Sequence, residues 1–225
     1  AIFHKAFPEE IIQYLMKQII DAVKYIHGKD IMHRDIKLEN IMISFNTDND
    51  KKNLNLLKST IKIIDFGTAR KGLGKTILCT FEYMAPYIIK KYQESQAGKY
   101  CKLEQYDQKV DIWSLGITCY YMLIGKIIYD WSSLDDLIGQ VEAGNYSVPT
   151  TISREMVSFL NGMLQYDPKR RLTAAQLSQH PFLTKNVSEF TRINTEASKK
   201  NLHMNTKKNQ TIWGIFKDEK KEKYE

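Results

Sequence analysis

The sequence predicts a mainly α fold of the α+β class, a helical bundle with one short β-hairpin. Two observations carry this prediction. Between Pro8 and Gly28, apolar residues recur every three or four positions, which is the period of an amphipathic helix. They are Ile12, Leu15, Met16, Ile19, Val23 and Ile26. Residues 41–43 and 61–64 are short apolar runs on either side of a polar stretch, and this arrangement is typical of the two strands of a hairpin.

The first helix is expected to carry Pro8 and the acids Glu9 and Glu10 in its first turn and to end at Gly28. Residues 112–125 carry no charge and are apolar on all sides, which favours a helix buried in the middle of a domain. That segment is shorter than the roughly 20 residues that a helix needs to cross a bilayer.

Two more helices are expected near the end of the domain. Ser153 can cap a helix that ends at residues 167–168, where an aspartate precedes a proline. The apolar face of that helix would be Met156, Val157, Leu160, Met163 and Leu164. Thr173 and Gln176 form a capping-box pattern for a short final helix that stops at Pro181.

The chemistry of the chain is concentrated in two short segments. Residues 33–40 read His-Arg-Asp-Ile-Lys-Leu-Glu-Asn, and residues 65–67 read Asp-Phe-Gly. Phosphoryl transfer needs a carboxylate that orients a hydroxyl and accepts its proton, a cation on the moving phosphate, and oxygens that hold magnesium. The residues that fit these tasks, in that order, are Asp35, Lys37, and Asn40 with Asp65. The predicted hairpin connects the two segments and would bring their ends together on one metal ion.

Three later motifs extend this pattern. Residues 80–86 read Thr-Phe-Glu-Tyr-Met-Ala-Pro, residues 111–116 Asp-Ile-Trp-Ser-Leu-Gly, and residues 167–173 Asp-Pro-Lys-Arg-Arg-Leu-Thr. With the two segments above, they resemble the eukaryotic protein kinase family, in the family's own order, over about residues 7–183. The resemblance implies the fold of the protein-kinase C-terminal lobe, with the hairpin at the catalytic site, and ATP and Mg2+ as cofactors.

The resemblance also implies a role for each matching residue. Asp35 is expected to be the catalytic base, and Lys37 to bind ATP at the phosphate that is transferred. Asn40 and Asp65 would hold Mg2+, and with Met42 they would form the part of the nucleotide site that this chain supplies.

The remaining matches are expected to be structural. They are His33, Phe66, Gly67, Asp111 and Arg171. By resemblance, His33 would pack beneath Phe66 and would not act as a base.

Two residues resemble the serine/threonine branch of the family. Lys37, two positions after Asp35, and Thr80 are expected to brace the aspartate and the incoming hydroxyl of a protein substrate. Thr76, four positions before Thr80, has the spacing of an activating phosphosite, and Arg34 would bind that phosphate. This implies an upstream activating kinase as a partner. The alternative is that Thr76 is an unmodified loop hydroxyl.

The sequence departs from the family at its start. The glycine-rich strand pair, the strand lysine and the helix glutamate of the family's smaller N-terminal lobe are absent from these 225 residues. Either the sequence is part of a longer kinase, or the protein lacks half of its nucleotide clamp. We therefore expect the isolated chain to bind ATP poorly and to be inactive without an N-terminal lobe.

A second departure is Tyr87, which stands where the family has the glutamate that pairs with the arginine matching Arg171. Because an unpaired buried charge is costly, Arg171 is expected to turn toward solvent or to bind another carboxylate. Examples of such carboxylates are Glu82, Glu94 and Glu104. Residues 45–60 and 90–105 are long polar connections, which indicate surface insertions. The charged residues of the first one, expected in solvent, are Asp48, Asp50, Lys51 and Lys52.

Composition sets the remaining expectations. The 225 residues, 43% of them hydrophobic, can bury one core, which we assign to a kinase domain at residues 1–183. Residues 184–225 indicate a basic, partly disordered tail, in which the apolar residues 212–216 are expected to dock on the lobe or on a partner.

The cysteines indicate a compartment. They are Cys79, Cys101 and Cys119, and their number and spacing match neither a disulfide framework nor a metal site. Free thiols favour an intracellular, cytoplasmic location. Because the sequence has no membrane span and no nucleic-acid reader motif beside its lysines, neither a membrane nor a nucleic acid is an expected partner.

Two hypotheses about function remain. The first is a serine/threonine protein kinase that transfers the γ-phosphate of ATP to a protein hydroxyl. The second is a catalytically silent kinase-like scaffold, or pseudokinase fragment, which the missing lobe and Tyr87 motivate. Pseudoenzymes often lose their polar catalytic residues. The first hypothesis is favoured because this sequence keeps all four of them, namely Asp35, Lys37, Asn40 and Asp65.

Overall fold

The computed structural model describes residues 6–74, 80–96, 106–129, 133–144, 146–190 and 210–211 of the chain. The helices are α1 (Glu9–Gly28), α2 (Asp48–Lys52), α3 (Pro86–Gln96), α4 (Lys109–Ile124), α5 (Leu134–Glu142), α6 (Arg154–Met163), α7 (Ala174–Leu177) and α8 (Pro181–Thr184). The strands are β1 (Ile31–Met32), β2 (Ile41–Phe45), β3 (Ser59–Ile63), β4 (Arg70–Lys71) and β5 (Gln210–Thr211). The described residues are therefore mainly helical with a few short strands, as the sequence predicts.

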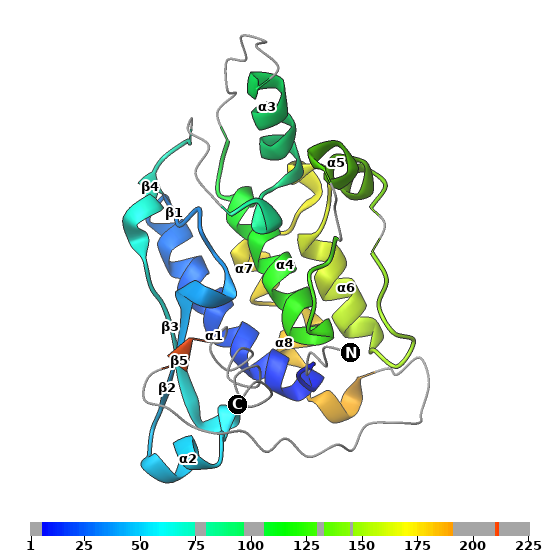
Figure 1. Ribbon diagram of the computed structural model, residues 1–225. Coiled ribbons are helices and arrows are strands. Elements are labelled where there is room, and N and C mark those ends of the chain that lie inside the picture. Colours follow the sequence, from blue (N-terminus) through cyan, green and yellow to red (C-terminus); the bar gives the residue numbers. More distant parts are fainter. Residues whose placement is uncertain are drawn as a thin grey trace, which may run out of the picture.

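Helix α4 lies in the middle of the molecule, between α1 on one side and α6 on the other (Figure 1). All of its residues from 111 to 123 are buried, which confirms the central helix predicted from an uncharged, apolar segment. It ends at Gly125, whose φ of 77° lies in the left-handed region that glycine adopts at low cost. Helices α3 and α5 pack against each other above it in Figure 1.

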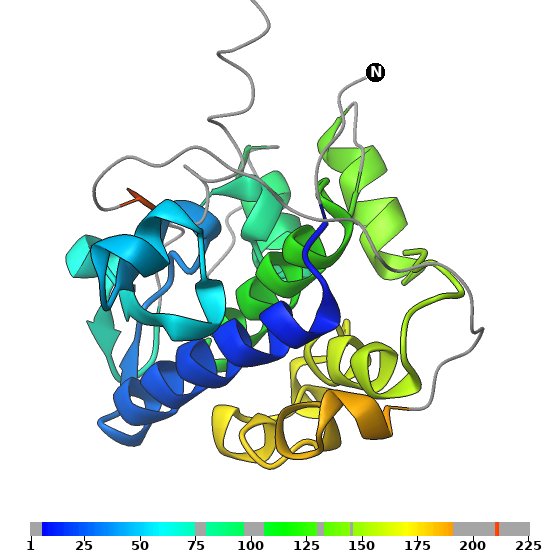
Figure 2. The ribbon, with the colours of Figure 1, turned by 90° about the horizontal axis from the view of Figure 1, so that it is seen from below.

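Helix α1 contacts both parts of the domain. Figure 2 shows it between the β2–β3 hairpin and the pair α7 and α8, and it packs against β3, α7 and α8. Its buried face is Ile12, Leu15, Met16, Ile19, Ile20 and Val23, which matches the predicted stripe apart from Ile26 and the additional Ile20. Burial of this stripe, at about 25 cal/mol per Å² of apolar surface, stabilises the helix more than its intrinsic propensity does.

The predicted hairpin is present. Strand β2 pairs antiparallel with β3, and its register runs from Ile41 opposite Ile63 to Phe45 opposite Ser59. On its other edge β2 pairs with β5, where Met42 lies opposite Thr211. Strands β1 and β4 form a separate two-stranded sheet.

Both predicted helix caps are confirmed. The hydroxyl of Ser153 accepts the backbone N–H of Met156 at 3.1 Å and so caps α6. Thr173 and Gln176 form the reciprocal capping box of α7. Pro181 does more than end a helix, because it occupies the first turn of α8, where its missing N–H has no partner to lose.

The connection between β2 and β3 corrects one expectation. Asp50 was expected in solvent with its charged neighbours, but it is 7% exposed. Its carboxylate accepts the Thr47 hydroxyl at 2.6 Å, while its backbone N–H donates to that hydroxyl at 3.0 Å. A capping partner on both groups makes the burial of this carboxylate tolerable, so the segment folds as helix α2 with Leu56 also buried.

The expectations for the cysteines and for the C-terminal tail can be compared with the described residues only in part. Cys119 is a free, buried cysteine, and burial raises the pKa of its thiol. The other two cysteines and residues 212–216 lie outside the described residues. Within the described residues, none of the helices combines the length and apolarity that crossing a bilayer requires.

Candidate active site

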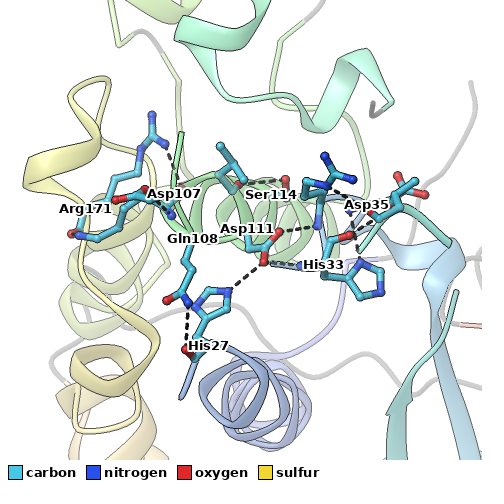
Figure 3. Close-up of polar contacts among 12 residues, drawn as sticks. His27, His33, Asp35, Asp107, Gln108, Asp111, Ser114 and Arg171 are labelled. Atoms are coloured by element: carbon cyan, nitrogen blue, oxygen red, sulfur yellow. Dashed lines mark hydrogen bonds and ion pairs between the residues drawn. The ribbon is translucent and has the colours of Figure 1, made fainter. Parts of the chain in front are cut away.

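The loop after β1 is fixed to helix α4 by one buried carboxylate. The backbone N–H groups of His33 and Arg34 donate to the two oxygens of Asp111, each at 2.8 Å. His27, on α1, places its Nε2 2.8 Å from the Asp111 carboxylate as well. Figure 3 shows Asp111 between His27 and the loop that carries His33 and Asp35. Asp111 therefore ties α1, α4 and this loop together.

Asp35, Lys37 and Thr80 form a compact cluster. The Lys37 Nζ lies 2.9 Å from an Asp35 carboxylate oxygen and donates to the Thr80 hydroxyl at 2.9 Å. The Thr80 hydroxyl in turn donates to the other Asp35 oxygen at 3.4 Å. A carboxylate and an ammonium are thus held side by side by residues from two separate segments, which fixes the orientation of both.

Asn40 completes the cluster from the start of the hairpin. Its amide nitrogen donates to the backbone carbonyl of Asp35 at 2.8 Å and to the Asp35 carboxylate at 2.9 Å. With the nitrogen engaged in this way, the amide oxygen is the atom that can face a cation.

The hairpin register sets the position of Asp65. Ile41 pairs with Ile63, and the N–H of Ile64 donates to the Asn40 carbonyl at 2.9 Å, so Asn40 and Asp65 lie at the same end of the hairpin. Asp65 is exposed, and its φ of 62° is unusual for a residue other than glycine. Its carboxylate accepts the N–H of Gly67 at 3.2 Å. An amide oxygen and a carboxylate suit Mg2+, which is bound by one or two carboxylates with water and phosphate oxygens.

His33 and Phe66 contact each other below this end of the hairpin. Their rings meet edge to face with centroids 4.7 Å apart, and His33 Nε2 lies 3.1 Å from the backbone carbonyl of Ile64. Phe66 remains 47% exposed on its other side. Met42, the remaining residue expected near the nucleotide, is half-buried on β2, and β5 pairs with its backbone.

The expectation for Arg171 is wrong. Its side chain neither turns toward solvent, being 2% exposed, nor uses Glu82 or Glu94. Glu104 lies outside the described residues. Instead, the guanidinium donates to three backbone carbonyls. They are those of Gln165 at 2.7 Å, Lys109 at 3.0 Å and Tyr166 at 3.0 Å.

The surroundings of Arg171 explain how its buried cation is tolerated without an ion pair to Glu82 or Glu94. Its guanidinium carbon lies 5.0 Å from the centre of the Trp113 ring, a cation–π contact. Burial lowers the Arg171 pKa to about 10, and the fields of Asp107, Tyr87 and Asp167 oppose that shift. Figure 3 shows Arg171 beside Asp107 at the far end of the same polar region. A pKa of about 10 leaves the group charged at neutral pH.

The segment between β4 and Thr80 is described up to Gly74, so the expected phosphosite Thr76 lies outside the described residues. Arg34, its expected partner, is 9% exposed and has a φ of 69°. Its side chain donates from Nε to the Thr68 carbonyl at 2.5 Å and from Nη1 to the Tyr106 hydroxyl at 3.2 Å. No motif in the sequence singles out Tyr106, because its contact with Arg34 is made across a distance of 72 residues.

Comparison with known proteins agrees with this geometry. The protein kinase domain family matches residues 2–183. The chain is 33% identical to sperm motility kinase 3A of Mus musculus over 78% of this chain and 31% of that protein. It is 34% identical to serine/threonine-protein kinase 33 of Bos taurus over 83% of this chain and 37% of that protein. It is 30% identical to an Aurora kinase of Eremothecium gossypii over 80% of this chain and 44% of that protein. The chain thus spans less than half the length of these relatives.

Proposed function

The chain belongs to the protein kinase domain family, and on that premise we propose that it carries the catalytic half of a serine/threonine protein kinase. Residues 1–183 would be the C-terminal lobe of the kinase domain, and residues 184–225 a basic tail. The reaction is transfer of the γ-phosphate of ATP to a serine or threonine hydroxyl of a protein. The observation that carries the proposal is the cluster in which Lys37 contacts both Asp35 and Thr80.

Asp35 acts on the substrate hydroxyl. Its carboxylate orients that hydroxyl toward the phosphorus and accepts its proton as the new oxygen–phosphorus bond forms and the bond to the ADP oxygen breaks. Asn40 donates two hydrogen bonds that hold Asp35 in place. A fixed orientation matters here, because the protein contributes positioning and charge more than covalent chemistry.

Lys37 and the hairpin end act on the phosphates. Lys37 would place its ammonium against the γ-phosphate, whose negative charge is spread over its oxygens during transfer. The Asn40 amide oxygen and the Asp65 carboxylate would hold Mg2+, which when bound would neutralise part of the phosphate charge. Met42 lines the nucleotide site from β2. Thr80 would lie beside the substrate hydroxyl, which favours a serine or threonine substrate. Of the three relatives named above, one is named a serine/threonine-protein kinase, and the names of the other two do not state which residue they phosphorylate.

The family's glycine-rich strand pair and phosphate-binding lysine are not among these 225 residues. We therefore expect weak ATP binding by the isolated chain and full activity only where an N-terminal lobe is present. An activating kinase that modifies Thr76 is a further expected partner. ATP as the phosphate donor and a free thiol at Cys119 favour a site of action inside the cell, in the cytoplasm.

The test is Asp35→Asn in the natural protein that contains this sequence, assayed for transfer from γ-labelled ATP to serine and threonine peptides. We expect activity to fall by at least about a hundredfold, because the variant cannot accept the proton. Asp30→Asn is the matched control, since Asp30 is exposed and has a left-handed φ of 59° that asparagine tolerates. Wild-type protein without any transfer would instead support the silent scaffold.

A further inference from the structure

Tyr106 connects the catalytic loop to the segment that follows β4. Its hydroxyl accepts a hydrogen bond from Arg34 Nη1 at 3.2 Å. Its backbone forms an isolated antiparallel bridge with Gly74, in which the Gly74 N–H donates to the Tyr106 carbonyl at 2.9 Å and the Tyr106 N–H to the Gly74 carbonyl at 3.2 Å. Tyr106 is 7% exposed, so these contacts are shielded from water.

Gly74 is required by this close approach. A Cβ atom at this position would lie 2.7 Å from the Tyr106 hydroxyl oxygen and still closer to two carbons of its ring. Real Cβ atoms do not approach other atoms so closely, and any larger side chain would push the ring or the segment away. The glycine therefore allows the segment to lie directly against Tyr106.

A second aromatic ring packs against Tyr106. The Tyr106 ring meets the Tyr87 ring edge to face, with centroids 6.4 Å apart. Tyr87, the residue in the place of the family's glutamate, thus packs against the ring whose hydroxyl bonds Arg34.

Arg34 links Tyr106 to the loop that carries Asp35. Its backbone N–H is held by Asp111, and Asp35 is the next residue along the chain. Its guanidinium bonds the Thr68 carbonyl and Tyr106, both of which belong to other segments. These two hydrogen bonds fix the orientation of the guanidinium.

We infer that Tyr106 is a positioning residue that holds residues 68–74 against the loop that carries Asp35, through Arg34. The consequence for catalysis rests on the proposed kinase function, whereas the structural link does not. In this arrangement the Tyr106 hydroxyl occupies a donor of Arg34, the residue expected to bind a phosphate at Thr76. Order at residues 68–74 thus depends on the Tyr106 side chain.

Hydrogen–deuterium exchange of the natural protein that contains this sequence, prepared without an activating kinase, tests the link. Tyr106→Phe keeps the ring and removes the hydroxyl, and we expect peptides that cover residues 68–74 to exchange about fivefold faster, the effect of one lost hydrogen bond. Tyr120→Phe is the matched control. Its hydroxyl makes one hydrogen bond elsewhere in the domain, to the Ser147 carbonyl at 2.9 Å, and the loss of that bond should leave residues 68–74 unchanged. Equal exchange in Tyr106→Phe and wild type would overturn the inference.

A second pair of variants tests the link from the other side. Gly74→Ala should also speed exchange at residues 68–74, because the added methyl group displaces the Tyr106 ring. Gly139→Ala is its control, since a Cβ there meets no atom within 4 Å. Gly74→Ala with wild-type exchange would show that the segment does not depend on the close approach and would count against the inference.

Phosphotransfer kinetics of the natural protein separate the positioning role from the proposed function. Tyr106→Phe is expected to lower kcat about fivefold with the KM for ATP unchanged, because Tyr106 acts on the catalytic loop and not on the nucleotide. Unchanged kcat would overturn the catalytic consequence. Absence of phosphotransfer in wild type would count against the kinase proposal alone, because the exchange experiment would still decide whether Tyr106 holds the segment.

Discussion

The Asp111 carboxylate accepts the backbone N–H of His33 at 2.8 Å, so the loop that carries His33 and Asp35 is anchored to the start of helix α4. The other carboxylate oxygen accepts the next N–H, that of Arg34, at the same distance. Hydrogen bonds to a charged acceptor are roughly twice as strong as those between neutral groups. The position of Asp35, the following residue, therefore depends on a helix that is buried along most of its length.

Asp111→Asn tests this dependence. An asparagine has only one carbonyl oxygen, so its NH2 group would face one of the two loop N–H groups and leave it unpaired. We expect the free energy of unfolding to fall by about 2 to 3 kcal/mol, measured by urea denaturation. Asp21→Asn, an exposed aspartate on α1, should change it by less than about 0.5 kcal/mol. Equal losses in the two variants would contradict the anchoring role.

Arg171→Lys tests whether the buried guanidinium is needed for its shape. A lysine keeps the charge, but it cannot reach three carbonyls in the plane of the Arg171 fork, and it leaves a poorly paired buried cation. We expect a loss of about 2 kcal/mol in the free energy of unfolding. The adjacent Arg170 is exposed, and Arg170→Lys provides the matched control with little expected change. A stable Arg171→Lys protein would mean that charge alone suffices.

Thr80→Val tests the hydroxyl between Lys37 and Asp35. The substitution keeps the side-chain shape and removes both hydrogen bonds, so the ammonium and the carboxylate lose their common partner. In the natural protein we expect kcat to fall by about a hundredfold, because even a small misplacement of the reacting groups slows the reaction strongly. Thr80→Ser restores the hydroxyl and should recover most of kcat. Should both variants lose activity equally, the methyl group and not the hydroxyl would be the important feature.

The lowered pKa of His180 makes the free energy of unfolding depend on pH. Burial lowers its pKa, an effect that Glu155 opposes, and its Nδ1 accepts the N–H of Phe182 at 3.1 Å, which protonation would prevent. The unfolded chain takes up the proton near pH 6.5, whereas the folded chain does so only at lower pH. Between these values the unfolded state binds more protons, so stability falls as the pH falls.

His180→Asn retains an N-cap acceptor without titrating in this range. We expect the free energy of unfolding of the variant to depend less on pH than that of wild type between about pH 7 and pH 5. Urea denaturation at several pH values measures both slopes. A variant as steep as wild type would assign the pH dependence to other groups.

The elements that the sequence predicts correctly depend on local pattern. The stripe of α1 and the two runs of the hairpin need only the periods of helix and strand, and the hairpin register then places Asn40 and Asp65 at one end. The caps at Ser153 and Thr173 likewise involve partners three residues away.

The features that the sequence does not predict depend on distant backbone groups. Arg171 binds carbonyls, which every residue carries, so residue types alone cannot identify its partners. Asp50 is buried because a neighbouring hydroxyl caps it, although its segment is polar throughout. The contact of Tyr106 with Arg34 joins two segments far apart in the chain, and no pattern connects them.

The measurement that tests the central claim most directly is phosphoamino-acid analysis of a mixed peptide substrate after incubation with the natural protein, Mg2+ and γ-labelled ATP. The account predicts label on serine and threonine, loss of transfer when Mg2+ is chelated, and loss in the Asp35→Asn variant. Transfer that survives Asp35→Asn, or label found on tyrosine alone, would contradict it.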